Sequence, residues 1–122
     1  MSVRSVGQKF VELCSQKKNF DVMQTMYAPN IVSVEGEGKE TAGKDPVIKK
    51  SKDWVSDKTF NGERVSGPFF NGANPDQFMV YFELDVTPKA TGKMITLKEV
   101  GVYTVNKDDL ITREQFFYDG AH

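Results

Sequence analysis

The stretch "ITLKEVGVYTVNKDDLITREQFFYD", which runs from Ile95 to Asp119, decides the fold. It predicts two long β-strands, Met94–Val105 and Leu110–Asp119, joined by a polar turn. Valine, isoleucine, threonine and aromatic residues crowd both runs, and such residues suit a pleated, half-buried surface. Two earlier runs, Phe60–Phe70 and Phe78–Val86, have the same character. The second half of the chain therefore predicts four antiparallel strands.

Upstream, apolar residues recur at the three- and four-residue steps that are typical of helices. The predicted elements are a helix over Val3–Cys14, a helix over Phe20–Tyr27, a strand over Ile31–Glu35 and a helix from Asp45 to about Lys58. Asn19 and Asp45 are suitable N-caps, and Pro29 ends the second helix. Helices followed by strands predict an α+β fold, with three helices packed on one face of an antiparallel sheet.

The composition describes one ordinary globular domain, residues 1–122, with 39% hydrophobic and 27% charged residues. A net charge of −1 gives no reason to expect a nucleic-acid partner, and no apolar run is long enough to span a membrane. The single cysteine, Cys14, and the single histidine, His122, predict neither a disulfide nor a metal site, and no cofactor motif is present. We expect a cytoplasmic protein whose chemistry depends on carboxylates, tyrosines or lysines.

Alternation divides the last three strands into two sets of residues, which we expect on opposite faces of the sheet. The apolar set is Val80, Phe82, Leu84, Val100, Val102, Ile111, Arg113, Gln115 and Phe117. The mixed set is Tyr81, Glu83, Leu97, Glu99, Gly101, Tyr103, Thr112, Glu114, Phe116 and Tyr118. Either the apolar set lies under the helices, or the mixed set does and lines a polar and aromatic pocket. The residue pattern alone leaves both arrangements open, with a preference for the first.

Two segments resemble a known superfamily. "MYAPNIVSVEGEG" followed by "TAGKDPVIKK" is similar to the opening of nuclear-transport-factor-2-like (NTF2-like) proteins, and "GVYTVNKDDLITREQFFYDG" is similar to their closing hairpin. The likeness covers nearly the whole chain and is strongest to SnoaL-like proteins, limonene-epoxide hydrolases and ketosteroid isomerases. It implies a cone, in which a strongly bent, mostly antiparallel sheet wraps around three N-terminal helices. It also implies an internal cavity for a small hydrophobic organic molecule and a homodimer formed through the outer sheet face.

The resemblance favours the mixed set as the cavity wall. The residues that it places in the pocket are Phe10, Tyr27, Ser51, Trp54, Tyr81, Glu83, Leu97, Tyr103, Phe116 and Tyr118. The known catalytic sets are incomplete here. Glu35 fills the position of the isomerase base, but Phe10 and Gly101 replace the two oxyanion donors, and Phe116 replaces an aspartate of the epoxide hydrolases. The fold therefore does not establish an activity.

Three glutamates, Glu35, Glu99 and Glu114, are the candidate catalytic residues. A hairpin centred on residues 107 and 108 would bring Glu114 opposite Gly101 and diagonal to Glu99, where the two carboxylates would titrate as a coupled pair. The alternative is that these glutamates are solvated surface residues. Two function classes follow: a carboxylate acid–base isomerase, cyclase or hydrolase of a hydrophobic organic substrate, and a non-catalytic ligand-binding or dimerisation module. Lys49, Lys50 and Lys52 are expected on a solvated helix face.

Overall fold

The computed structural model describes residues 2–119, so His122 lies outside the described residues. The elements follow in the order α1 (Val3–Ser15), α2 (Asn19–Met26), β1 (Tyr27–Val34), β2 (Glu40–Ala42), α3 (Lys44–Ser56), β3 (Lys58–Asn71), β4 (Asn74–Pro88), β5 (Ile95–Val105) and β6 (Ile111–Tyr118). The predicted α+β fold with three N-terminal helices is confirmed.

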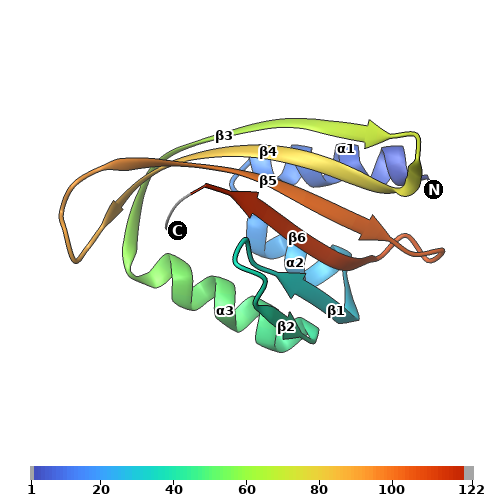
Figure 1. The fold of residues 1–122 in the computed structure, drawn as a ribbon, viewed down its shortest axis with the longest axis horizontal. Coiled ribbons are helices and arrows are strands. Elements are labelled where there is room, and N and C mark those ends of the chain that lie inside the picture. The colour runs from blue at the N-terminus through green and yellow to red at the C-terminus, as the bar shows by residue number, and fades with distance from the viewer. Residues whose placement is uncertain (1, 120–122) are drawn as a thin grey trace.

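The strands form one six-stranded sheet in the order β2-β1-β6-β5-β4-β3. Strands β3 to β6 pair antiparallel with their neighbours in sequence, whereas β1 pairs parallel with β6. The sheet curls over the helices, and Figure 1 shows α3 crossing the open side opposite β3, β4 and β5. A cavity can form between the curled sheet and the helices because only one sheet face is covered by them.

The helix boundaries differ from the predicted ones at two starts and one end. Lys18, not Asn19, is the N-cap of α2, and Gly43, not Asp45, is the N-cap of α3. Gly43 has a φ of 97°, a conformation that favours glycine, and its carbonyl accepts the first helical hydrogen bond of α3. Helix α2 ends at Met26, so Tyr27 begins β1. This last change matters because Tyr27 consequently faces β6 rather than a neighbouring helix.

The predicted face of β4 is wrong. In the structure Phe82 lies opposite Glu99, and Leu84 lies opposite Leu97. Residues that lie opposite each other in a sheet share one face. The cavity side therefore combines the apolar residues of β4 with the mixed residues of β5 and β6. Tyr81 and Glu83 lie on the outer face, because alternation fixes the face within a strand but not across the loop that joins two strands.

The predicted register of the closing hairpin is also wrong. Gly101 lies opposite Phe116, and Glu114 lies opposite Tyr103. The register shifts between Thr104 and Val105, next to a turn in which the Asn106 side chain accepts two backbone hydrogen bonds. Glu99 consequently lies opposite Tyr118, four residues along β6 from Glu114. The expected diagonal contact between Glu99 and Glu114 is therefore absent.

The core lies between the concave sheet face and the helices. Its buried side chains come from the three helices and from β1, β4, β5 and β6, and include Val6, Phe10, Val22, Val47, Phe78, Val80, Phe82, Tyr103 and Ile111. Phe78 stacks on Tyr103 with ring centroids 5.1 Å apart, and Phe10 packs against both rings. None of the helices in the described part of the chain is long and apolar enough to cross a membrane.

Candidate functional site

A cavity of about 600 Å³ lies between the three helices and the concave face of the sheet. Much of its wall is apolar, contributed by side chains such as Phe10, Val22, Met23, Trp54, Val55, Phe82, Leu84 and Phe116. Five glutamates also line it: Glu35, Glu37, Glu63, Glu99 and Glu114. Glu35, Glu99 and Glu114, the three candidate catalytic residues, thus border one space. A mostly apolar cavity with a few polar groups is the usual form of a small-molecule site.

Glu114 is the most deeply buried of these carboxyl groups, with 1% of its surface exposed. Loss of hydration raises its pKa above the ordinary value, and this effect outweighs the opposing ones. Hydrogen bonds from Tyr27 and Ser33 and the charge of Lys50 act in the opposite direction, towards a lower pKa. Strand β1 brings Tyr27 and Ser33 to Glu114 because it runs parallel beside β6, where Ser33 lies opposite Glu114.

Lys50 connects this buried group to a more exposed carboxylate. Its ammonium group donates a hydrogen bond to the Ser33 hydroxyl, with a distance of 2.7 Å from Nζ to Oγ, and it forms an ion pair with Glu35. The expectation of a solvated Lys50 was wrong, because this side chain lines the cavity. Its position three residues after Val47 and four before Trp54 places it on the inner side of α3, and this spacing is the signal that was available in the sequence.

Tyr103 presents its hydroxyl to the same region. The residue is 2% exposed, and the negative charges that act on its hydroxyl include those of Glu114 and Glu99. Burial raises its pKa well above the ordinary tyrosine value. Gly101 leaves room for the ring, because a methyl group added there would lie 2.6 Å from the Tyr103 hydroxyl oxygen. Within residues 2–119 this hydroxyl has no hydrogen-bond partner, so it is available to a bound molecule.

A second carboxylate cluster lies elsewhere on the cavity wall. Burial raises the pKa of Glu63, and the nearby charge of Glu99 raises it further. Asn19 donates a hydrogen bond of 3.3 Å to Glu63 Oε1. Cys14 lines the cavity here, and burial followed by the charge of Glu63 raises its thiol pKa to about 12. Glu63 could not be predicted as a cavity residue because apolar and polar residues do not alternate regularly around it in β3.

Tyr118 closes one edge of the cavity. Its hydroxyl donates a hydrogen bond of 2.6 Å to Glu37 Oε2, which belongs to the turn between β1 and β2. Its ring lies against Gly36, where an added methyl group would approach the ring to between 2.7 and 2.9 Å. Burial, followed by the hydrogen bond to Glu37, raises the pKa of Tyr118 to about 12. The glycine-rich turn thus positions Tyr118 at the cavity wall.

Most residues that the sequence placed in the pocket line this cavity in the structure. They are Phe10, Tyr27, Ser51, Trp54, Tyr103, Phe116 and Tyr118. Leu97 is buried in the core on the same sheet face but does not border the cavity. Tyr81 and Glu83 do not line it either, because they point to the outer face of the sheet.

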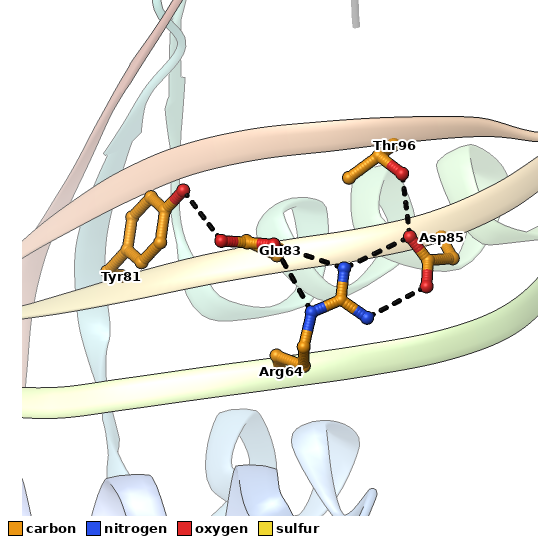
Figure 2. A network of polar contacts seen from close by, with 5 residues as sticks. All are labelled: Arg64, Tyr81, Glu83, Asp85 and Thr96. Carbon is orange, nitrogen blue, oxygen red and sulfur yellow. Dashed lines mark hydrogen bonds and ion pairs between the residues drawn. The ribbon is translucent and has the colours of Figure 1, made fainter.

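On that outer face Tyr81 and Glu83 belong to a surface network of polar contacts, shown in Figure 2. The Arg64 guanidinium of β3 binds both carboxylates of β4: Nη1 lies 2.8 Å from Asp85 Oδ2, and Nη2 lies 3.1 Å from Glu83 Oε2. Thr96 of β5 donates a hydrogen bond of 2.7 Å to Asp85. These hydrogen bonds, that from Arg64 foremost, lower the pKa of Asp85 to about 2. The network joins three strands and stands apart from the cavity.

The described residues contain no group of three or more histidine, cysteine, aspartate or glutamate side chains arranged to hold a metal ion. The ionisable groups on the cavity wall are carboxyl, ammonium, phenol and thiol groups. A buried carboxyl group with a raised pKa can hold and release a proton, and a buried phenol can donate a hydrogen bond.

The chain matches a known protein family. The family model for the SnoaL-like domain matches residues 1–118. A crystal structure from Mesorhizobium loti, named as a candidate SnoaL-like polyketide cyclase, is 39% identical with a TM-score of 0.88, and the match covers 97% of this chain and 100% of that one. No curated protein matches the sequence.

More distant structures share the fold. A Mycobacterium tuberculosis protein in complex with estradiol-17β-hemisuccinate is 17% identical with a TM-score of 0.73, over 98% of this chain and 95% of that one. A candidate isomerase from Bacillus subtilis is also 17% identical with a TM-score of 0.73, over 98% and 90% of the two chains. The fold, the family model and the closer structure agree, and the chain belongs to the SnoaL-like family of NTF2-like proteins.

Proposed function

We propose that the protein binds a small, mostly apolar carbonyl compound in its cavity and catalyses proton transfer on it. The observation that carries this proposal is the position of Glu114. Its carboxyl group is almost completely buried in the wall of a largely apolar cavity. Such burial makes a carboxyl group hold its proton to higher pH, where it can act as an acid or, once deprotonated, as a base.

The neighbouring groups have distinct roles in this proposal. Glu114 moves the proton, and the Tyr103 hydroxyl donates a hydrogen bond to the substrate oxygen on which negative charge develops. Tyr27 donates a hydrogen bond to Glu114 and fixes its orientation. Glu35, the expected base, is instead ion-paired with Lys50. We therefore assign the proton transfer to Glu114.

The size and the lining of the cavity support a class of substrates rather than one particular compound. A volume of about 600 Å³ lies within the range of about 300 to 1,000 Å³ that is usual for small organic ligands. The aromatic and aliphatic walls favour an apolar ring system. The steroid ester bound by the M. tuberculosis protein of the same fold is consistent with this class.

The outer sheet face supports a homodimer. Its apolar part is smaller than expected, because Val80, Phe82, Leu84 and Ile111 are buried in the core. The outward residues of the paired strands still form one strip: Met79, Tyr81, Val100, Val102 and Phe117. We propose that two copies of the chain cover this strip by a two-fold pairing.

The test is deuterium incorporation from D₂O next to the carbonyl group of cyclohexenone, tetralone and a steroid enone, followed by proton NMR. We expect the protein to accelerate exchange in at least one of them. Glu114→Gln and Tyr103→Phe should each lower the rate about a hundredfold. Glu12→Gln, an exposed glutamate on α1, is the matched control and should leave it unchanged.

Binding is measured in parallel as the rise in melting temperature with each compound. A compound that binds to the wild type but exchanges no faster than in buffer would contradict catalysis and support the binding module. An equal exchange rate in wild type and Glu114→Gln would contradict the role of Glu114.

A further inference from the structure

A chain of polar side chains leads from the partly exposed part of the cavity wall to buried Glu114. It begins at Glu35 and Lys50, whose side chains are 24% and 27% exposed, and continues through Ser33, which is fully buried. Lys50 comes from α3, Ser33 from β1 and Glu114 from β6. Three elements that are distant in sequence thus contribute to one continuous path.

The chemistry of the donors fixes the direction of these hydrogen bonds. A lysine ammonium group has only protons to donate, so Ser33 Oγ is the acceptor in its contact with Lys50. The single Ser33 proton then remains available for the Glu114 carboxylate, which lies opposite Ser33 in the parallel pairing of β1 and β6. Each member of the chain can therefore donate to the next, in the order required for proton transfer.

We propose that Lys50 and Ser33 conduct protons between solvent and Glu114, so that Glu114 recovers its proton while the cavity is occupied. This inference rests on the proposed function, since it supplies the proton that Glu114 gives to the substrate. Lys50 and Ser33 are proton carriers in this scheme and need not touch the substrate. A bound ligand would block direct access of water to Glu114 from the cavity, whereas Ser33 is fully buried and does not border the cavity.

The transfer balances in three linked moves. The Ser33 O–H bond breaks as its proton passes to the Glu114 carboxylate. The Ser33 oxygen takes a proton from the Lys50 ammonium group, which becomes a neutral amine. Lys50 then takes one proton from solvent, where a hydronium ion becomes water. Lys50 and Ser33 return to their starting forms, and the net result is one proton moved from solvent to Glu114.

The other groups around Glu114 provide no equivalent route. Tyr27 from β1 and Tyr103 from β5 face it, but both are buried and the pKa of each is raised well above the ordinary value. Cys14 from α1, which adjoins these two tyrosines, has a pKa of about 12. Glu35 acts on Glu114 as a distant negative charge, and Lys50 as a positive one. Among the residues that the structure describes around Glu114, only Ser33 and Lys50 form a path that ends at partly exposed groups.

The experiment needs no substrate. The infrared C=O band of protonated Glu114, identified by its loss in Glu114→Gln, is followed after a light-triggered drop in pH. We expect the band to appear about a hundredfold more slowly in Ser33→Ala, because a positioned proton carrier is lost. Lys50→Arg should slow it comparably, since arginine keeps the charge and the donors but does not release a proton. Lys49→Arg, on the exposed side of the same helix, is the control and should have no effect.

A second readout separates conduction from an electrostatic role. If Lys50 conducts protons, Lys50→Arg leaves the equilibrium pKa of Glu114 near its wild-type value while the rate falls. Unchanged rates in both Ser33→Ala and Lys50→Arg would overturn the inference, and the proposed function would survive if ketone exchange still depended on Glu114. Slowed protonation without any ketone exchange would leave the proton path intact and overturn the proposed function instead.

Discussion

The pKa of Glu114 is set by opposing effects of known sign. Burial removes its hydration and favours the neutral acid, whereas Tyr27, Ser33 and the Lys50 charge favour the carboxylate. The balance leaves the folded-state pKa above the ordinary value. A nearby phenol, Tyr103, has no partner within residues 2–119. These two groups give the cavity a proton carrier and a hydrogen-bond donor side by side.

The raised pKa predicts how stability depends on pH. Because Glu114 binds its proton more tightly in the folded state, its contribution to stability is complete below the unfolded pKa of about 4.3 and is lost as pH rises through the folded value. Glutamine has nearly the same shape as glutamic acid but cannot ionise, so Glu114→Gln removes the titration of this side chain. We expect its free energy of unfolding, measured with urea, to fall less than that of the wild type between about pH 4 and pH 8. Parallel curves for the two proteins would show that Glu114 is not perturbed.

Sequence reasoning found Glu114 and its neighbours Tyr27 and Tyr103, but it missed Lys50 and Ser33. Strand alternation assigned Glu114 to the mixed set, and the family resemblance turned that set inward. Lys50 was missed because a lysine on a helix is usually solvated, and only its ion pair with Glu35 and its contact with Ser33 hold it inside. Ser33 was missed because its partners come from α3 and β6, which the parallel pairing of β1 and β6 brings together.

Among the elements, β5 depends on one glycine. Tyr103 bends back over Gly101, so its ring occupies the space that a side chain at position 101 would need. Gly101→Ala would force the Tyr103 ring out of its buried position. The substitution should destabilise the fold by about 1 to 3 kcal/mol, the usual range for overpacking. Urea denaturation measures this loss. Gly72→Ala, where nothing lies within contact distance, is the control. An equal effect of the two substitutions would contradict the packing described for Tyr103.

Strands β3 and β4 are joined on the outside by Arg64. Its guanidinium holds the pKa of Asp85 at about 2, so the pair contributes stability that is lost as pH falls from the ordinary aspartate range toward that value. Arg64→Gln should return the Asp85 pKa towards the ordinary value of about 3.9. Carboxyl ¹³C NMR titration measures the shift. An unchanged Asp85 pKa in the variant would show that the network in Figure 2 is not formed in solution.

Strands β4, β5 and β6 show what the alternation of residues along a strand can and cannot predict. Within β4 the alternation correctly separates Phe82 and Leu84 from Tyr81 and Glu83. It does not say which group shares a face with Glu99, because that depends on the path of the loop between β4 and β5. The error in the β5–β6 hairpin has the same origin, since a turn that shifts the register by two residues moves Glu114 from Gly101 to Tyr103.

At the scale of the whole molecule, the order of helices and strands predicts the fold. The apolar strip on the outer sheet face predicts the oligomeric state. Val102 lies in this strip between Met79 and Gln115. We expect a dimer by sedimentation at micromolar concentration and a monomer or aggregates for Val102→Asp, because a charge there would be buried in the interface. Ser15→Asp, exposed on α1, is the control. A wild-type monomer under these conditions would contradict the dimer.

The curled sheet and its helices together bury a glutamate, so that its carboxyl group keeps its proton to higher pH than an exposed glutamate does. The most direct test of this claim is a ¹³C NMR titration of the Glu114 side-chain carboxyl, assigned by the loss of its signal in Glu114→Gln. The account predicts a midpoint clearly above about 4.3, the ordinary glutamate value. A midpoint at or below that value would contradict the proposed acid–base role.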